Sequence, residues 1–375
     1  MRKFLSLLLT MAMVLSLAVT VNAAAPKEDI TILHTNDVHC DYEKYAKVAT
    51  LHKSADLLVD AGDHVQGDVI GTLSKGEYIV DIMNYIKYDA AVPGNHEFDY
   101  GMDQFLHIAK DLAKYPYLSA NFTGKDGTPY FDAYKIFEVK GVKVAFVGVC
   151  TPETFTKSTP AYFMNASQTK YIYDILGGDD GQKLYKAVQK AIDKAKLLGA
   201  TYIIGLGHLG VDPSSAPWTS EEVIAHTTGF DAFIDGHSHT VMENKQVTDA
   251  SGKTVTLTQT GSYFKNVGKM TIGADGSITT ELLPSYDGAD AAVAAATSEW
   301  VSAVDDMLGE EIAVGDSKFY ITDPATGKRR IRSGETNLGD FVADGIYTYF
   351  NEIEELHCDI AIMNGGGIRT DVEAG

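Results

Sequence analysis

The chain has 375 residues, of which 45% are apolar and 22% charged, and this composition excludes a disordered tail or a fibrous repeat. Its 51 acidic side chains outnumber the 31 basic ones, so the formal charge is −20, which disfavours nucleic-acid polymers and anionic membranes as partners because like charges repel. A small phosphorylated substrate held by local positive charge is compatible with this field. The length indicates two domains. No stable protein partner is predicted, and the oligomeric state stays open.

The first residues have the pattern of a targeting segment. Arg2 and Lys3 precede the apolar run Phe4–Val21, and small residues follow it before Pro26. This order predicts a secretory signal peptide over residues 1–25 and export to the periplasm, the cell surface or the medium. An uncleaved membrane anchor is the alternative, since the apolar run is close to the length that spans a bilayer. The small residues and the proline, in place of a basic flank, favour cleavage.

Short apolar runs alternate with stretches of helical periodicity between residues 29 and 283, a pattern typical of an α/β fold with a mostly buried sheet. Strands are predicted at Ile30–His34, Leu57–Val59, Ala90–Val92, Val142–Val149, Tyr202–Leu206 and Phe230–Ile234. Helices are predicted at Tyr42–His52, Tyr78–Ile86, Met102–Ala113 and Lys183–Leu198.

The end of this block changes character. Thr256–Gln259 and Lys269–Ile272 alternate between apolar and polar residues and are separated by glycine-containing turns, which predicts antiparallel strands that close a first domain over residues 26–287. The alanine-rich stretch that follows predicts one connector helix over residues 288–309. A second unit then occupies residues 310–375, which is short for an independent domain.

The chain has three cysteines, Cys40, Cys150 and Cys358, and no Cys-x-x-Cys pair. This pattern indicates neither a disulfide framework nor a thiolate zinc site. Cys150 ends an apolar run and is expected in the core. Cys40 lies beside His39, so it is either a small spacer or a contact of whatever His39 binds.

Five of the predicted strands end in a short loop that carries Asp, Asn or His. Loops at the carboxyl ends of strands in an open α/β sheet converge on one crevice, so we expect these side chains to meet there. Adjacent glycines allow the sharp backbone turns that such an approach requires. The residues of these loops that could bind a metal are Asp37, His39, Asp63, Asn95, His208, His237 and His239.

The composition of this set indicates the kind of metal. Imidazole and oxygen ligands without thiolate suit Zn, Mn, Co, Fe or a similar divalent ion, whose identity stays open. Seven ligands are too many for one tetrahedral zinc, whereas two ions that share a bridging carboxylate would use them all. Such a pair supports metal-assisted hydrolysis of a phosphate ester.

The order of the motifs, Asp-x-His, Gly-Asp, Gly-Asn-His-Glu, Gly-His and Gly-His-x-His, resembles that of the calcineurin-like metallophosphoesterases. The strings Leu33–Asp37 and Gly94–Asp99 are similar to the exported 5′-nucleotidase branch, which includes UDP-sugar hydrolases and 2′,3′-cyclic-nucleotide phosphodiesterases. The resemblance covers essentially the whole chain after the signal segment. It implies a metallophosphoesterase β-sandwich flanked by helices, followed by a connector helix and an incomplete α/β substrate-binding domain.

The resemblance also implies a role for each site residue. It gives one ion the ligands Asp37, His39, Asp63 and His239. It gives the other ion Asp63, Asn95, His208 and His237. His96 matches the catalytic histidine, which stabilises charge on the phosphoryl group or protonates the leaving oxygen, and Asp99 matches its partner. Three residues apart at a helix start, the two can lie on one face, where the carboxylate would orient and charge the imidazole.

The second unit carries motifs that resemble the 5′-nucleotidase C-terminal domain, whose role is substrate binding. By this resemblance Arg332, Asn364 and Arg369 contact the nucleotide, and rotation of this domain brings it to the metals. Surface arginines on a turn are the alternative reading. Relatives continue well beyond Gly375 and supply aromatic residues that clamp the base, so base preference stays open.

The remaining motifs and histidines give less information about function. Gly205–Gly210 matches the dinucleotide fingerprint, but prolines follow where a helix must begin, so a role for His208 as ligand is favoured. His34 is expected to be buried and hydrogen-bonded. His64 directly follows the predicted bridging carboxylate and is either structural or a support for the site.

We therefore predict an exported phosphohydrolase with two divalent ions that releases phosphate from nucleoside 5′-monophosphates by attack of metal-activated water. A UDP-sugar, a 2′,3′-cyclic nucleotide or a sulfur-based ester is the alternative substrate of the same site. A non-catalytic surface protein that binds nucleotides is the alternative from another class.

Overall fold

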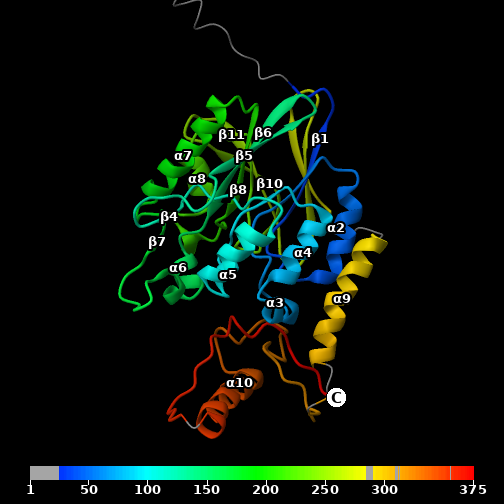
Figure 1. Ribbon diagram of the computed structural model, residues 1–375, viewed down its shortest axis with the longest axis vertical. Helices are drawn as coiled ribbons and strands as arrows, with labels where there is room; N and C mark the ends of the chain where they lie inside the picture. The colour runs from blue at the N-terminus through cyan, green and yellow to red at the C-terminus, as the bar shows by residue number, and fades with distance from the viewer. Residues whose placement is uncertain (1–24, 284–289, 309–310, 312, 355) are drawn as a thin grey trace, which may run out of the picture. The chain divides into compact units, whose positions relative to one another are not determined.

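Figure 1 shows the computed structural model of the chain, which describes residues 25–283, 290–308, 311, 313–354 and 356–375. The predicted signal peptide falls almost entirely outside these residues. The chain forms two compact units, Met1–Asp305 and Asp306–Gly375, and each is considered by itself. None of the helices in the described ranges has the length and apolarity needed to cross a membrane.

The first sheet of the larger unit has the strand order β13-β12-β1-β2-β3. Strands β1, β2 and β3 run parallel, and β12 and β13 add to the β1 edge in antiparallel pairs. Its strands are β1 Ile30–Thr35, β2 Leu57–Asp60, β3 Ala90–Ala91, β12 Val267–Ile272 and β13 Ile278–Leu283.

The second sheet has the order β10-β11-β9-β8-β6-β5. Its centre, β6, β8, β9 and β11, is parallel, and β5 and β10 pair antiparallel at the two edges. Its strands are β5 Tyr134–Val139, β6 Val142–Cys150, β8 Tyr202–His208, β9 Ala232–Ile234, β10 Val241–Thr248 and β11 Thr254–Thr260. A separate two-stranded ribbon pairs β4 Phe122–Gly124 with β7 Tyr173–Ile175.

The two sheets pack face to face around an apolar layer that both supply. Ile32 and Val59 from the first sheet contact the same cluster as Phe146, Leu206 and Ile234 from the second, and all five are fully buried. The central strands are buried on both faces, which explains why they consist of continuous apolar runs. The predicted β-sandwich is confirmed.

Helices cover the outer face of each sheet (Figure 1). Helices α2, α4, α5 and the start of α9 pack on the first sheet, and α7 and α8 pack on the second. The helices are α2 Tyr45–His52, α3 Val69–Ser74, α4 Glu77–Ile86, α5 Met102–His107, α6 Thr154–Lys157, α7 Gln182–Leu197, α8 Ser220–Ala225, α9 Ala291–Leu308 and α10 Asn337–Thr348. Single turns are η1 Tyr42–Lys44, η2 His96–Phe98, η3 Ile108–Leu112, η4 Pro160–Phe163, η5 Pro213–Ser215 and η6 Tyr349–Ile353.

The structure corrects the prediction at several elements. The helix expected over Met102–Ala113 divides into α5 and η3, a turn of π-helix. Strand β11 is antiparallel to β10 as expected, but it is parallel to β9. Strand β10 was not predicted because its sequence is polar and most of its residues are exposed at the sheet edge.

The smaller unit contains α10, η6 and two isolated bridges, Phe319 with Val372 and Thr322 with Arg329. Helix α10 begins at a Thr336 cap, whose Oγ1 accepts a hydrogen bond from Gly339 N at 3.2 Å.

Candidate metal centre

The loops after β1, β2, β3, β8 and β9 bring the predicted ligands together at the carboxyl ends of the parallel strands. Six of them form two groups in which every ligand atom lies within 4.8 Å of the others. The groups are Asp37, His39 and His239, and Asp63, His208 and His237. A third group joins Asp63 and His39 to His96, so it links the first two groups through His39 and Asp63.

Individual distances show how tightly these side chains pack. His208 Nε2 lies 3.1 Å from Asp63 Oδ2, and His239 Nε2 lies 3.4 Å from Asp37 Oδ1. His39 Nε2 and His239 Nε2 are 3.1 Å apart. Nitrogen and oxygen atoms from the ends of four strands therefore lie within about 3.5 Å of one another in pairs.

Asn95, the seventh predicted ligand, is next in sequence to His96, whose backbone N–H donates to Asp63 Oδ1 at 2.8 Å. Its side chain is buried, and Asn95 Oδ1 has no hydrogen-bond partner among the described residues. The neighbouring Gly94 is required, because a Cβ there would overlap Asp63 Oδ1.

Five of the seven predicted ligands have an unusual backbone. Asp37, His39, Asp63, His237 and His239 all have φ between 47° and 77°, the left-handed region that residues with side chains rarely adopt. Such strain costs of order 1–3 kcal/mol per residue and is typical of functional sites.

The electrostatics of the cluster favour a cation. Burial opposes the charge of His208, but the carboxylates of Asp63 and Asp37 raise its pKa to about 10. Burial lowers the pKa of His39 to about 4, so this imidazole is neutral at pH 7 and has a lone pair to offer. Asn95 Oδ1 is buried without a hydrogen-bond partner among the described residues. An unpartnered oxygen atom beside buried carboxylates fits divalent metal ligation.

His96 and Asp99 form the pair expected of them. His96 Nδ1 lies 2.6 Å from Asp99 Oδ2, and Ser158 Oγ donates to Asp99 Oδ1 at 2.8 Å. Both side chains remain about one fifth exposed, so a substrate can reach them. The carboxylate holds the imidazole with its other nitrogen, Nε2, as the atom available for proton transfer.

Glu97 is a buried support that we did not single out from the sequence. Its carboxylate accepts backbone N–H bonds from Gly94, Asp63, His64 and Val65, the two middle ones at 2.9 and 2.8 Å. One side chain therefore ties the loop after β2 to the loop after β3 and fixes the backbone at Asp63 and at Gly94, which precedes Asn95. Only the string Gly94–Asp99 pointed to this region.

Glu153 is a second residue that sequence reasoning missed. Its Oε2 lies 2.9 Å from His237 Nε2 and accepts a hydrogen bond from Ser215 Oγ at 2.7 Å. Although burial opposes it, the bond from His237 holds the pKa of Glu153 below its usual value. The carboxylate therefore accepts the Nε2 proton and leaves the lone pair of His237 Nδ1 free to bind a metal ion. Glu153 follows the end of β6. A search for polar residues directly after buried strands, which located the other five loops, could therefore have found it as well.

The remaining expectations have mixed outcomes. His64 is buried behind the site and bonds Asp60 Oδ1 at 2.8 Å and the Tyr117 hydroxyl at 2.7 Å, so it supports the β2 loop. Cys40 is buried and donates to His64 O, away from the ligand cluster. The expectation for His34 was half wrong: the ring is buried, but neither nitrogen has a hydrogen-bond partner among the described residues, because it lies against Gly268.

The three predicted nucleotide contacts belong to the smaller unit. The geometry places Arg332 and Asn364 side by side, since a Cβ at Gly366 would lie 3.2 Å from the Arg332 guanidinium and 3.3 Å from Asn364 Nδ2. Arg369 lies on the same segment, whose backbone carbonyls at Ile368 and Gly365 accept hydrogen bonds from Arg329.

Imidazole and carboxylate ligands gathered at the strand ends of a helix-covered β-sandwich, beside a histidine–aspartate pair, define a metal-dependent phosphoesterase. The chain belongs to the calcineurin-like phosphoesterase family, whose model matches residues 30–241, and residues 313–375 match the 5′-nucleotidase C-terminal domain.

Curated relatives support the same family. The 5′-nucleotidase of Homo sapiens is 28% identical over 96% of this chain and 68% of its own length. The trifunctional nucleotide phosphoesterase protein YfkN of Bacillus subtilis (strain 168) is 28% identical over 94% of this chain and 26% of its length. The solved 5′-nucleotidase precursor from Thermus thermophilus superposes with a TM-score of 0.72 at 22% identity, covering 92% of this chain and 71% of that one. The chain thus spans about two thirds of the first of these relatives.

Proposed function

We propose that this phosphoesterase releases phosphate from nucleoside 5′-monophosphates with two divalent ions, bound by Asp37, His39, Asp63 and His239 on one side and by Asp63, Asn95, His208 and His237 on the other. The observation that carries the proposal is that Asp63, which groups with His208, also shares a group with His39, a ligand of the other proposed ion. A shared carboxylate is the natural bridge of a two-metal site.

Metal ions held there would act as Lewis acids on the phosphoryl oxygens and lower the pKa of bound water. The protein's own contribution begins with orientation. Glu97 fixes the backbone that carries Asp63, and Glu153 fixes the ring of His237. His96, oriented by Asp99 Oδ2 at 2.6 Å, stabilises the phosphoryl charge or gives a proton from Nε2 to the leaving nucleoside oxygen.

Binding of the nucleotide is assigned to the smaller unit. Arg332 offers a planar pair of donors, and Asn364 beside it offers an amide, a combination suited to phosphate or sugar oxygens. Arg369 is assigned the same role. This assignment requires the nucleotide to reach both units during turnover.

Export is part of the proposal and rests on the N-terminal pattern of Arg2 and Lys3 followed by an apolar run. Pulse labelling in a cell that secretes the chain would detect loss of about 25 residues. Retention of Met1 in the exported protein would contradict cleavage.

The substrate is tested by measuring phosphate release from AMP, UDP-glucose, 2′,3′-cyclic AMP and an aryl phosphate at fixed metal concentration. We expect the highest kcat/KM with AMP. A preference for UDP-glucose or the cyclic nucleotide would assign the same site to another ester. Tight AMP binding without phosphate release would identify a non-catalytic binding protein.

A further inference from the structure

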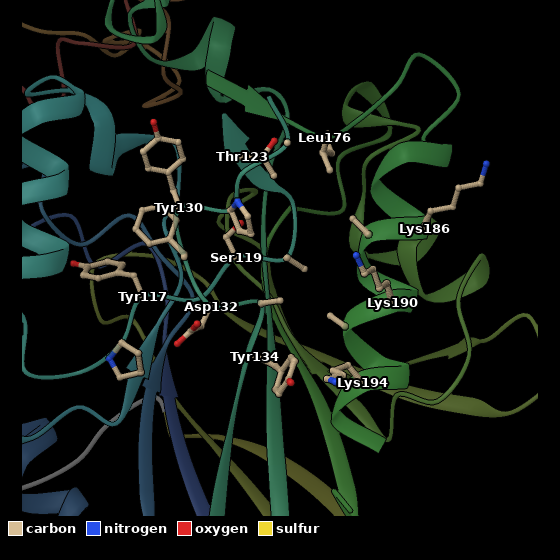
Figure 2. A pocket seen from close by; sticks show the side chains of 18 of the residues that line it. Tyr117, Ser119, Thr123, Tyr130, Asp132, Tyr134, Leu176, Lys186, Lys190 and Lys194 are labelled. Atoms are coloured by element: carbon tan, nitrogen blue, oxygen red, sulfur yellow. The ribbon is translucent and has the colours of Figure 1, made fainter. Parts of the chain in front are cut away.

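A cavity of about 890 Å³ opens between helix α7 and the segment that runs from η3 to β5 (Figure 2). None of the seven candidate metal ligands lines it. Its volume falls in the range of about 300–1,000 Å³ that is typical of small-molecule sites. We call this cavity the α7 pocket, lined on one side by Lys183–Lys194 of α7 and on the other by Tyr130–Tyr134.

One wall of the α7 pocket is cationic. Four lysines three or four residues apart share one face of α7, and Lys110 of η3 lines the pocket as well. Asp132 is the one carboxylate among the lining residues. Within the described residues, no carboxylate forms an ion pair with any of the four α7 lysines, which are Lys183, Lys186, Lys190 and Lys194. The chain has a formal net charge of −20, so this positively charged wall is opposite in sign to the molecule as a whole.

The orientation of the lysines matters for binding. In Figure 2 the side chains of Lys190 and Lys194 extend from α7 toward the tyrosines, whereas Lys186 extends away. An anion inside the pocket would therefore meet Lys190 and Lys194 first, with the other lysines adding to the field.

The opposite wall is aromatic. Tyr130, Phe131 and Tyr134 line it, and Lys110 Nζ lies 5.4 Å from the centroid of the Tyr130 ring. Aromatic faces bind a planar ring by stacking, and the neighbouring ammonium adds a favourable electrostatic contact. The two walls together match a ligand with a flat ring at one end and negative charge at the other.

A buried hydroxyl gives an independent indication of a ligand. Thr123 of β4 lines the pocket and is only 7% exposed, and its Oγ1 has no hydrogen-bond partner among the described residues. Buried polar groups without partners are rare because they lose their hydration without replacement. A polar atom of a bound molecule would satisfy this hydroxyl.

We propose that the α7 pocket is a second, non-catalytic binding site for a nucleoside phosphate, with the base against Tyr130 and Phe131 and the phosphates against Lys190 and Lys194. The proposal rests on the pocket alone and holds whichever ester the metal centre hydrolyses. Together with nucleotide binding at the metal centre, it predicts that the metal-loaded chain binds nucleotide at two sites.

The test is isothermal titration of the metal-loaded full chain with adenosine 5′-(α,β-methylene)diphosphate, whose phosphorus–carbon bridge resists hydrolysis. We expect two sites, one of which weakens at least tenfold between 50 and 500 mM salt. The variant Lys190→Glu/Lys194→Glu should lose that site and keep hydrolysis of a small aryl phosphate. The control Lys170→Glu/Lys196→Glu changes the charge equally at exposed lysines outside the pocket and should keep both sites.

A further variant and two further ligands test which parts of the nucleotide the α7 pocket recognises. Thr123→Val should weaken the same site several-fold without lowering the thermal midpoint. Adenosine and inorganic tripolyphosphate should each bind there at least tenfold more weakly than the nucleotide. Equal binding of tripolyphosphate, or a second site unaffected by Lys190→Glu/Lys194→Glu, would overturn the proposal. A single site that the double variant abolishes would support the pocket and instead count against nucleotide binding at the metal centre.

Discussion

Glu153 shows how much of the site depends on side chains that touch no substrate. Its carboxylate holds His237 Nε2 at 2.9 Å and is itself held by Ser215 Oγ at 2.7 Å. Carboxylates that orient a metal-binding histidine typically contribute about 10–100-fold in metal affinity. Glu153 is therefore a positioning residue for the ion that we propose His208 and His237 bind.

Glu153→Ala is expected to weaken one metal ion about 10–100-fold and to leave the other within about threefold. Glu153→Gln should lose less, because its amide oxygen still accepts the Nε2 proton. Competition with a chromogenic chelator measures both affinities. Glu138→Gln, at an exposed position of β5, is the control. If Glu153→Ala bound both ions with unchanged affinity, Glu153 would not position His237 for metal binding.

His96 is assigned proton transfer or charge stabilisation at the reacting phosphate. His96→Ala should lower kcat about 10²–10⁴-fold, the usual contribution of general acid catalysis, while metal content stays nearly unchanged. The readout is kcat together with elemental analysis of the same sample. Loss of the metals in this variant would instead identify His96 as a ligand, an outcome that its proximity to His39 and Asp63 would explain.

At the scale of elements, Glu97 joins two loops. Its four backbone N–H donors come from the loops after β2 and β3, and all would lose a charged acceptor in Glu97→Gln. We expect a loss of about 3 kcal/mol in the free energy of unfolding, because an amide group places its own N–H against buried donors. Urea unfolding in the presence of chelator measures this loss apart from metal binding.

The control for this prediction is again Glu138→Gln, which should change the free energy of unfolding by less than about 0.5 kcal/mol. A similarly small loss in Glu97→Gln would show that solvent or rearranged loops satisfy those backbone donors.

The strands that carry the candidate metal centre could be predicted from the sequence. Buried parallel strands such as β2 and β8 consist of apolar runs, and polar residues directly after them are easily seen, so Asp63 and His208 could be located from sequence. Strand β10 could not, because an exposed edge strand lacks the apolar pattern. The contacts of Glu97 and Glu153 depend on loops far apart in sequence, which periodicity does not relate to one another.

At the scale of the whole molecule, the chemistry and the apolar clusters belong to one unit. All seven predicted ligands, His96 and the three buried clusters lie before Asp306 in the described part of the chain. The smaller unit contributes Arg332, Asn364 and Arg369. The proposed metal ligands and the proposed nucleotide contacts are therefore separable along the sequence.

A chain that ends at Asp305 should bind the same metals and hydrolyse an aryl phosphate within about threefold of the full chain. Its KM for AMP should rise at least tenfold, because the residues assigned to nucleotide binding are missing. Steady-state kinetics on both substrates measures the difference. An unchanged KM for AMP would contradict the assignment of Arg332, Asn364 and Arg369.

The most direct measurement is the number of metal ions per chain, determined by inductively coupled plasma mass spectrometry after metal loading and gel filtration, for the wild type and for Asp63→Asn. The bridging arrangement predicts two ions in the wild type and weakened retention of both in the variant. One ion in the wild type, or two fully retained ions in Asp63→Asn, would contradict it.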